Sequence, residues 1–208
     1  MSQISLKNET YRKCFHVLLI LAPIAYYNLG KWLSVAIFAS MASVVVSLDY
    51  MRRSNKAVQE IFVKSFSIIL RPHEVTGDKL CGVSWVALAA CINFLFFPAE
   101  IAVTAFVILA ISDAAAAIIG RNFPSQPFFE KTLNGSAAFF LTALIILISC
   151  GLIYHARFWF YFFGLFTLSV ITIMEARPSM FKIDDNFLIP IAFSVTMTIF
   201  DIMWNYSY

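Results

Sequence analysis

The chain has 208 residues, of which 61% are hydrophobic and only 13% are Asp, Glu, Lys or Arg. A soluble globular domain carries roughly 25% charged residues, so this composition excludes a water-soluble fold and indicates a membrane protein. The formal net charge is only +3, and we expect no nucleic-acid partner from so small an excess of basic residues.

Seven stretches of the chain are nearly uncharged and approach the length of a membrane-spanning helix, which needs about 20 residues with a range of roughly 17 to 25. The predicted spans are Cys14–Leu29, Trp32–Leu48, Leu80–Phe97, Ala99–Ile119, Ser136–Tyr154, Phe158–Met174 and Phe187–Trp204. The first is the shortest and contains Pro23. Basic residues precede it, as in a signal peptide, but no small-residue cleavage site follows, so we expect a helix of the mature protein.

The stretch Asn55–Leu70 is too charged to cross a membrane, yet its apolar residues recur at helical spacing. This pattern is typical of an amphipathic helix that lies on a membrane surface. Its predicted apolar face consists of Val58, Ile61, Phe62, Phe66 and Ile69. We therefore expect an all-α polytopic membrane protein with about seven transmembrane helices, one amphipathic surface helix, and a single integral-membrane domain over residues 1–208.

The basic residues are distributed unequally between alternate loops. Thirteen of the fifteen Lys and Arg residues fall on the side of the N-terminus, and only Lys31 and Arg157 fall on the other. Because short cytoplasmic loops are enriched in Lys and Arg, we predict a cytoplasmic N-terminus and a C-terminus outside. The membrane would be a bacterial inner membrane or the endoplasmic reticulum. Functional residues are expected on the cytoplasmic side, where the long polar loops lie.

Two groups of polar residues precede predicted spans on the cytoplasmic side. Arg12, Lys13 and His16 lie within one helical turn and share a face, where they could bind an anion. The alternative is that the two cations only set the topology and His16 is a core residue. Arg71 and Glu74 precede the third span, and for them a solvated loop is an equal alternative.

Asp113 lies inside the fourth predicted span, roughly 10 Å of helix rise from its cytoplasmic end. An ionisable group inside a membrane costs free energy and is functional by default. The alternative is a packing carboxylate that bonds to a polar residue of a facing helix.

The loop that follows Asp113 predicts a phosphate site. A helix N-terminus offers backbone amide donors and a favourable dipole to an anion, and cationic side chains add charge-assisted hydrogen bonds. Ordinary cytoplasmic loop charge is the alternative. The residues concerned, from the end of the fourth span to the start of the fifth, are Gly120, Arg121, Lys131, Thr132, Gly135 and Ser136.

The last cytoplasmic loop gathers acidic residues, with Glu175 at its start and Asp184, Asp185 and Asn186 at its end. Carboxylate and amide oxygens are the ligands that Mg²⁺ prefers, usually together with substrate phosphates. Together with Asp113 on the same side, these residues predict a metal site, although acidic loop residues can also serve only for solvation. The chain contains neither a P-loop motif nor a Rossmann glycine motif, so a nucleotide site would be built from membrane helices and cytoplasmic loops.

These motifs, in this order, resemble the membrane family of CTP-dependent lipid kinases that contains dolichol kinase, phytol kinase and the yeast-type diacylglycerol kinase. A more distant similarity is to phosphatidate cytidylyltransferases, and the resemblance covers nearly the whole chain. The matching segments are 12–16, 71–74 followed by Gly77 and Gly82, 112–121, 131–136, Glu175 and 184–190. Asn134 replaces the usual Glu, and Ala114 replaces a frequent Pro. The first departure puts a metal or base role at position 134 in doubt.

The resemblance implies Mg²⁺-dependent transfer of the terminal phosphoryl group of CTP to a membrane lipid alcohol. The acceptor would be diacylglycerol or an isoprenoid alcohol such as a polyprenol or phytol. The implied nucleotide-binding residues are Arg12, Lys13, His16, Gly120, Arg121, Lys131, Thr132, Gly135 and Ser136. The implied catalytic residues are Asp113, Glu175 and Asp185, the metal ligands are Asp113, Asp184 and Asp185, and Arg71, Glu74 and Asn186 complete the site.

Two other functions use the same residues. A phosphatidate cytidylyltransferase would need a similar set of cations and carboxylates and would differ in which phosphorus of CTP is attacked. A transporter would use Asp113 as an ion site, but no inverted repeat is visible and the charges lie at one face of the membrane.

Overall fold

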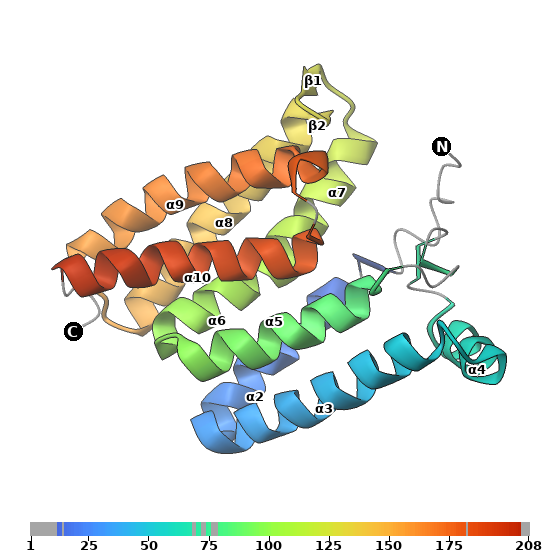
Figure 1. The fold of residues 1–208 in the computed structure, drawn as a ribbon. Coiled ribbons are helices and arrows are strands. Elements are labelled where there is room, and N and C mark those ends of the chain that lie inside the picture. Colours follow the sequence, from blue (N-terminus) through green and yellow to red (C-terminus); the bar gives the residue numbers. More distant parts are fainter. Residues whose placement is uncertain are drawn as a thin grey trace.

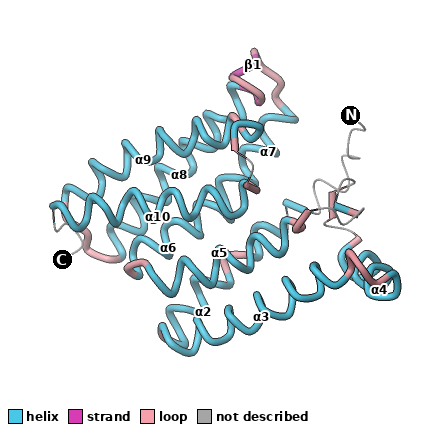
Figure 2. The backbone as a smooth tube through the Cα atoms, viewed as in Figure 1, coloured by secondary structure: helices cyan, strands magenta, loops and turns pink. Residues whose placement is uncertain are grey.

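The structure is a computed structural model that describes residues 12–13, 15–67, 70–71, 74–75, 79–181 and 183–204. Within these residues the chain is helical apart from its loops and one short hairpin, and the long helices run side by side (Figures 1 and 2). The hairpin pairs β1 (Pro127–Phe128) antiparallel with β2 (Lys131–Thr132). The prediction of an all-α fold is confirmed, with this hairpin as a small addition.

Five helices are long and apolar enough to cross a membrane, and they indicate an integral multi-pass membrane protein. They span Lys31–Met51, Ala99–Asn122, Leu133–Ile153, Phe158–Ala176 and Asp185–Trp204. The first and third predicted spans are shorter apolar helices, Phe15–Leu29 and Gly82–Phe96. Seven crossings therefore remain a prediction, and Cys14, where the first was expected to begin, lies outside the described residues.

The first half of the bundle consists of α2 (Leu21–Leu29), α3 (Lys31–Met51), α4 (Lys56–Phe66) and α5 (Gly82–Phe96). Helices α2 and α3 are joined by Gly30 alone, whose φ of 77° lies in the left-handed region that glycine adopts without steric cost. Helix α3 then packs along α5, and the two run side by side in Figure 1.

Helix α4 confirms the expected amphipathic helix but is shorter than the predicted stretch 55–70. It begins at Lys56, because the side chain of Asn55 accepts hydrogen bonds from two backbone amides of its first turn. Phe62 is buried beneath the guanidinium of Arg52, 4.7 Å from the ring centroid, whereas Ile61 is 68% exposed. The expected apolar residue Ile69 lies outside the described residues, and a position on the membrane surface remains a prediction.

The fourth predicted span is one continuous helix with an irregular centre. It consists of α6 (Ala99–Val107), the π-helical segment η2 (Ile108–Ser112) and α7 (Asp113–Asn122). π-Helical turns inside α-helices occur frequently at functional sites. Here the π turn ends immediately before Asp113, so it sets the direction in which that carboxylate leaves the helix.

The remaining helices follow this central span along the chain. They are α8 (Leu133–Ile153), α9 (Phe158–Ala176), the 3₁₀ turn η3 (Pro178–Met180) and α10 (Asp185–Trp204). Every residue of α6 from Glu100 to Phe106 is buried, so α6 forms the core of the bundle. The outer helices instead expose large apolar side chains, among them Leu152, Phe158 and Ile202, as a lipid-facing surface requires.

Candidate functional site

Charged side chains from distant parts of the sequence line one cavity of about 570 Å³ at one end of the bundle. Five are cationic and four are acidic: Arg12, Lys13, Arg71, Arg121, Lys131, Asp113, Glu130, Glu175 and Asp185. They come from the start of the chain, the segment before α5, both ends of α7, the hairpin, the end of α9 and the start of α10. The three predicted catalytic residues, Asp113, Glu175 and Asp185, therefore lie around the same cavity.

Asp113 joins the first helix to the central span. The ammonium group of Lys13 donates a hydrogen bond to Asp113 Oδ2, and His16 Nδ1 lies 3.2 Å from the same oxygen. Lys13, His16 and Asp113 are all buried. The Asp113 carboxylate bonds to a facing helix, as the packing interpretation expects, and it also lines the cavity, so a functional role remains a prediction.

Lys131 and Glu175 form a second ion pair beside the cavity, in which the ammonium group bonds to Glu175 Oε1. Burial disfavours the charged form of Lys131, but the nearby carboxylates of Glu175 and Asp113 outweigh it and raise the pKa of Lys131 above its usual value. Glu175 Oε2 is buried and has no hydrogen-bond partner among the described residues. An acceptor left unpaired in this way is costly unless a ligand satisfies it.

Arg71 bridges the two consecutive aspartates at the start of α10. Its Nη1 lies 2.9 Å from Asp184 Oδ2 and its Nη2 lies 3.2 Å from Asp185 Oδ1. Burial opposes the charge of Arg71, but Asp185, Asp184 and Glu74 raise its pKa above the usual value. Asp185 faces the charged cavity, whereas Asp184 faces a neighbouring cavity of about 440 Å³.

Asp184 caps helix α10, which is a structural role that the sequence did not indicate. Its Oδ1 accepts a hydrogen bond of 3.0 Å from the amide of Asn186. Burial and the adjacent charge of Asp185 raise the pKa of Asp184 to about 7. Capping and the bond to Arg71 already occupy this carboxylate, which was predicted as a metal ligand.

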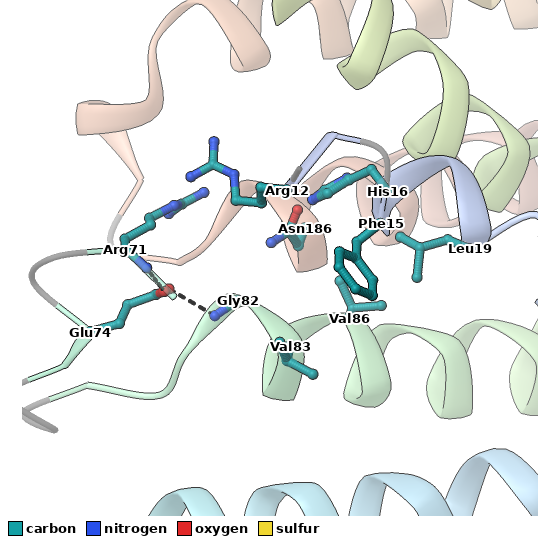
Figure 3. A pocket seen from close by; sticks show the side chains of 10 residues that line it. All are labelled: Arg12, Phe15, His16, Leu19, Arg71, Glu74, Gly82, Val83, Val86 and Asn186. Atoms are coloured by element: carbon teal, nitrogen blue, oxygen red, sulfur yellow. Dashed lines mark hydrogen bonds between the residues drawn. The ribbon is translucent and has the colours of Figure 1, made fainter. Parts of the chain in front are cut away.

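Glu74 and Asn186 lie behind Arg71 instead of on the charged cavity. Glu74 Oε2 accepts from the amide of Arg71 at 2.7 Å, and Glu74 Oε1 accepts from the amide of Gly82 at 2.8 Å (Figure 3). A Cβ atom at Gly82 would lie 2.8 Å from Asn186 Nδ2, so a larger residue here would require the Asn186 side chain to shift. Glu74 thus ties the backbone of Arg71 to the start of α5, while Gly77 lies outside the described residues.

The predicted phosphate loop brings α7 and α8 into close contact. A Cβ atom at Gly120 would lie 2.9 Å from Thr132 Oγ1 and 3.2 Å from Gly135 Cα. Thr132 caps α8 by accepting from the amide of Gly135 at 3.2 Å. Gly120, Thr132 and Gly135 also line the cavity, whereas Ser136 is buried with an Oγ that has no partner among the described residues.

The first backbone amides of α8 are already hydrogen-bonded. The amide of Leu133 donates to Gln126 O at 3.0 Å, and the amide of Asn134 donates to Ser125 Oγ at 2.9 Å. The expectation that this helix start offers free amide donors to phosphate therefore finds no support, because these amides donate to acceptors within the same loop. Side-chain cations remain the groups that can neutralise a phosphate here. The Asn134 side chain contributes to the closure through a bond of 3.0 Å to Phe123 O.

Two features of this end of the molecule were not found from the sequence, and the first is the attachment of the hairpin to the end of α9. Glu130, in the turn of the hairpin, lines the cavity and bonds to the hydroxyl and amide of Ser179. The guanidinium of Arg177 lies 3.8 Å from the ring centroid of Phe129, which fastens the hairpin to the end of α9. Neither residue belongs to a sequence motif, so only their position beside Lys131 and Glu175 could have indicated them.

The second missed feature is a closed network beneath α4. Arg52 Nε lies 2.5 Å from Asp49 Oδ1, and Arg52 Nη1 donates to Glu74 O. Asp49 Oδ2 accepts from the Cys81 amide at 2.8 Å and from the Ser84 hydroxyl at 2.6 Å. Arg52 directly follows helix α3 and is only 1% exposed, so burial within this network is a feature that the sequence did not indicate.

Among the described residues no group of three or more His, Cys, Asp or Glu side chains is arranged to hold a metal ion. A metal at this site would need further ligands from a substrate. The predicted ligand set of Asp113, Asp184 and Asp185 therefore remains a proposal.

A bundle of apolar helices with a charged cavity at one end defines a multi-pass membrane protein with a polar site. No family model and no solved structure matches the chain. The chain belongs to the family of the uncharacterized protein RP860 of Rickettsia prowazekii, with 30% identity over 195 residues, 92% of this chain and 94% of that protein. It is also distantly similar to CTP-dependent diacylglycerol kinase 1 of Saccharomyces cerevisiae, with 24% identity over 216 residues, 92% of this chain and 73% of the yeast protein. This second similarity suggests a relative of the lipid kinases.

Proposed function

We propose that this protein is a CTP-dependent kinase that transfers a phosphoryl group to the hydroxyl of a membrane lipid alcohol. The observation that carries the proposal is the single cavity in which five cations and four carboxylates meet at one end of an apolar bundle. The similarity to the yeast kinase supports CTP as donor and a lipid as acceptor. Diacylglycerol and isoprenoid alcohols are the acceptors to be tested.

The cations of the cavity are suited to hold a triphosphate. Phosphoryl transfer needs positioning and neutralisation of charge more than covalent chemistry from the protein. Arg12, Lys13, Arg121 and Lys131 would supply that neutralisation, and the raised pKa of Lys131 keeps its ammonium group charged. The close approach of α7 and α8 at the glycines brings Arg121 and Lys131 to the same cavity.

The carboxylates of the cavity fit a metal that arrives with the nucleotide. Mg²⁺ is usually bound by one or two carboxylates together with substrate phosphates, so a cage of three acidic residues is not required. Asp113 and Asp185 line the cavity and would hold the ion, whereas Asp184 serves α10 as its cap. When bound, Mg²⁺ would neutralise charge on the phosphate oxygens.

Glu175 is the residue best placed to accept the proton of the attacking hydroxyl. Asp113 Oδ2 already accepts from Lys13, and Asp185 is bonded to Arg71, but Glu175 Oε2 is buried and unpartnered among the described residues. The acceptor oxygen would form a bond to the terminal phosphorus of CTP, and the bond from that phosphorus to the bridging oxygen would break. CDP leaves, and the hydroxyl proton passes to Glu175.

The position of the labelled phosphorus tests the proposal. Purified protein in lipid vesicles receives CTP labelled at the terminal or the first phosphorus, with diacylglycerol or a polyprenol as acceptor. We expect terminal label in the lipid fraction, no label from the first phosphorus, and CDP as product. Label from the first phosphorus with phosphatidate as acceptor, and release of pyrophosphate, would identify a cytidylyltransferase instead.

The proposal also requires the cavity to face the compartment that contains CTP. Reporter fusions after Ser54, Ser125 and Ser179 should all report cytoplasm, and a fusion after the last residue should report the outer side. A cytoplasmic C-terminus would contradict seven crossings. The compartment that the charged end of the bundle faces would then have to be determined anew.

A further inference from the structure

An apolar groove of about 410 Å³ lies between the first helix, α3 and α5. All of its lining side chains are Ala, Val, Leu, Ile, Phe or Met. Leu21 and Met41 at its edge are each 58% exposed, so the groove opens on the surface that faces lipid, and Phe106 of the buried span α6 also lines it. Alanines such as Ala22 and Ala87 leave the space that larger residues would fill.

The groove continues toward the charged cavity. A smaller cavity of about 140 Å³ shares Leu19, Val83 and Val86 with the groove, and shares Arg12 and Arg71 with the charged cavity. Figure 3 shows Leu19 of the first helix opposite Val86 of α5, with Arg12 and Arg71 farther along. The lining therefore changes from hydrocarbon to charge across three neighbouring cavities that share lining residues.

Pro23 explains why the first helix is irregular where the cavities meet. Proline has no amide hydrogen to donate to the carbonyl one turn earlier, at Leu19. The preceding turn is tightened instead, since the amides of Leu19 and Ile20 bond to His16 O and Val17 O, three residues back. The irregular turn thus falls between His16, which contacts Asp113, and the part of the helix that lines the groove.

We propose that this groove holds the hydrocarbon chain of the lipid alcohol, which enters sideways from the bilayer and presents its hydroxyl past His16 to the charged cavity. The inference rests on the proposed function and names the path of its acceptor. A lipid chain fits better than a protein helix, because only a small cavity of about 140 Å³ lies between the groove and the charged cavity. The chain remains in an apolar environment while only the hydroxyl reaches the charges.

Two substitutions fill the groove without touching the charged residues. Ala22→Phe and Ala87→Phe place a ring in the groove from the first helix and from α5, respectively. Ala36→Phe is the matched control, because Ala36 is exposed on α3 and lies outside the groove lining. Melting temperature in detergent identifies any variant that fails to fold.

Photolabelling without CTP measures occupancy independently of catalysis. Vesicles contain a diacylglycerol or a polyprenol with a diazirine at the end of its chain. We expect label on α2, α3 and α5, lost in folded Ala22→Phe and Ala87→Phe and retained in Ala36→Phe. Label spread over the outer faces of α8, α9 and α10, or unchanged by the groove variants, would overturn the proposal.

Kinetics separate the groove from the kinase activity. With long-chain acceptor, the groove variants should raise KM by about tenfold or more, as changes of a few methylene groups in an apolar pocket do. KM for CTP and turnover of dihexanoylglycerol should not change. Equal loss with long and short acceptors would contradict the groove. If the unmodified protein transfers no terminal phosphoryl group to either alcohol while the label maps to the groove, the proposed function fails and the lipid path stands.

Discussion

Two clusters of buried charge lie at the same end of the bundle and differ in what surrounds them. Around Asp49 and Arg52, each oxygen of the carboxylate accepts a hydrogen bond, and both side chains are closed off from solvent. Around Asp113 and Glu175, the ion pairs border a cavity of about 570 Å³, and one oxygen of Glu175 has no partner among the described residues. A saturated cluster fixes the fold, whereas an open cluster can accept a ligand.

The largest expected effect concerns the closed cluster. Arg52→Ala would leave Asp49 as a buried charge without its cation, which costs about 3–5 kcal/mol in stability. Its sequence neighbour Arg53 is exposed, so Arg53→Ala should change stability by no more than about 0.5 kcal/mol. Thermal unfolding in detergent measures both. Equal stability of the two variants would remove the distinction between the clusters.

In the open cluster, Asp113→Asn should strongly reduce catalysis with a smaller effect on folding. The substitution keeps the shape and removes the charge that faces Lys13 and His16. Activity with terminally labelled CTP should fall at least roughly a hundredfold, the scale on which single electrostatic groups act in catalysis. The melting temperature should stay closer to that of the unmodified protein than the melting temperature of Arg52→Ala does. Near-normal turnover would return Asp113 to a packing role.

The glycine contact beneath the cavity should show an intermediate effect on stability. In Gly135→Ala, the new Cβ would lie 3.0 Å from Thr132 Oγ1 and 3.1 Å from Ala116 O, so these neighbours must shift by a few tenths of an ångström. Overpacking of this kind costs about 1–3 kcal/mol. Ala137→Leu, at an exposed position of the same helix, is the control. Unchanged melting of Gly135→Ala would show that the two helices can adjust without cost.

The last prediction is a pH dependence of stability at the α10 cap. Because the pKa of Asp184 is raised to about 7, the folded state binds this proton more tightly than the unfolded state does. The contribution to stability is thus present at low pH and is lost as pH rises toward 7. Asp184→Asn should flatten this part of the stability profile measured in EDTA, since Asn also caps helices well. A profile that keeps the same slope would assign the titration to another group.

The helices could be predicted from the sequence because their signal is local. Long apolar runs gave the five long helices, and helical spacing gave α4. The ends were less predictable. Helix α5 begins at Gly82, after a segment in which the amide of Cys81 bonds to Asp49, more than thirty residues earlier. No pattern within the apolar run indicates that bond.

The residues of the candidate site were likewise predictable only in part. Motif order indicated Asp113, Glu175 and Asp185, and the structure places all three on one cavity. Motif order could not separate Asp185 from Asp184, which are neighbours in the chain yet face different cavities on either side of Arg71. It also gave no sign of Glu130, whose place depends on the hairpin and on the end of α9.

The sequence by itself determined that this protein is helical and built of membrane-spanning lengths of apolar chain, and it predicted that the charged residues of its motifs gather at one end. The length of an apolar run and the basic charge of a loop are properties of single segments, so they can be recognised without knowing which segments pack together. Only the tertiary structure decided which charges are closed into the fold and which border an open cavity. Arg52 and Arg53 show the reason. Burial and hydrogen bonding depend on partners that lie far along the chain, and adjacent identical residues can face opposite environments.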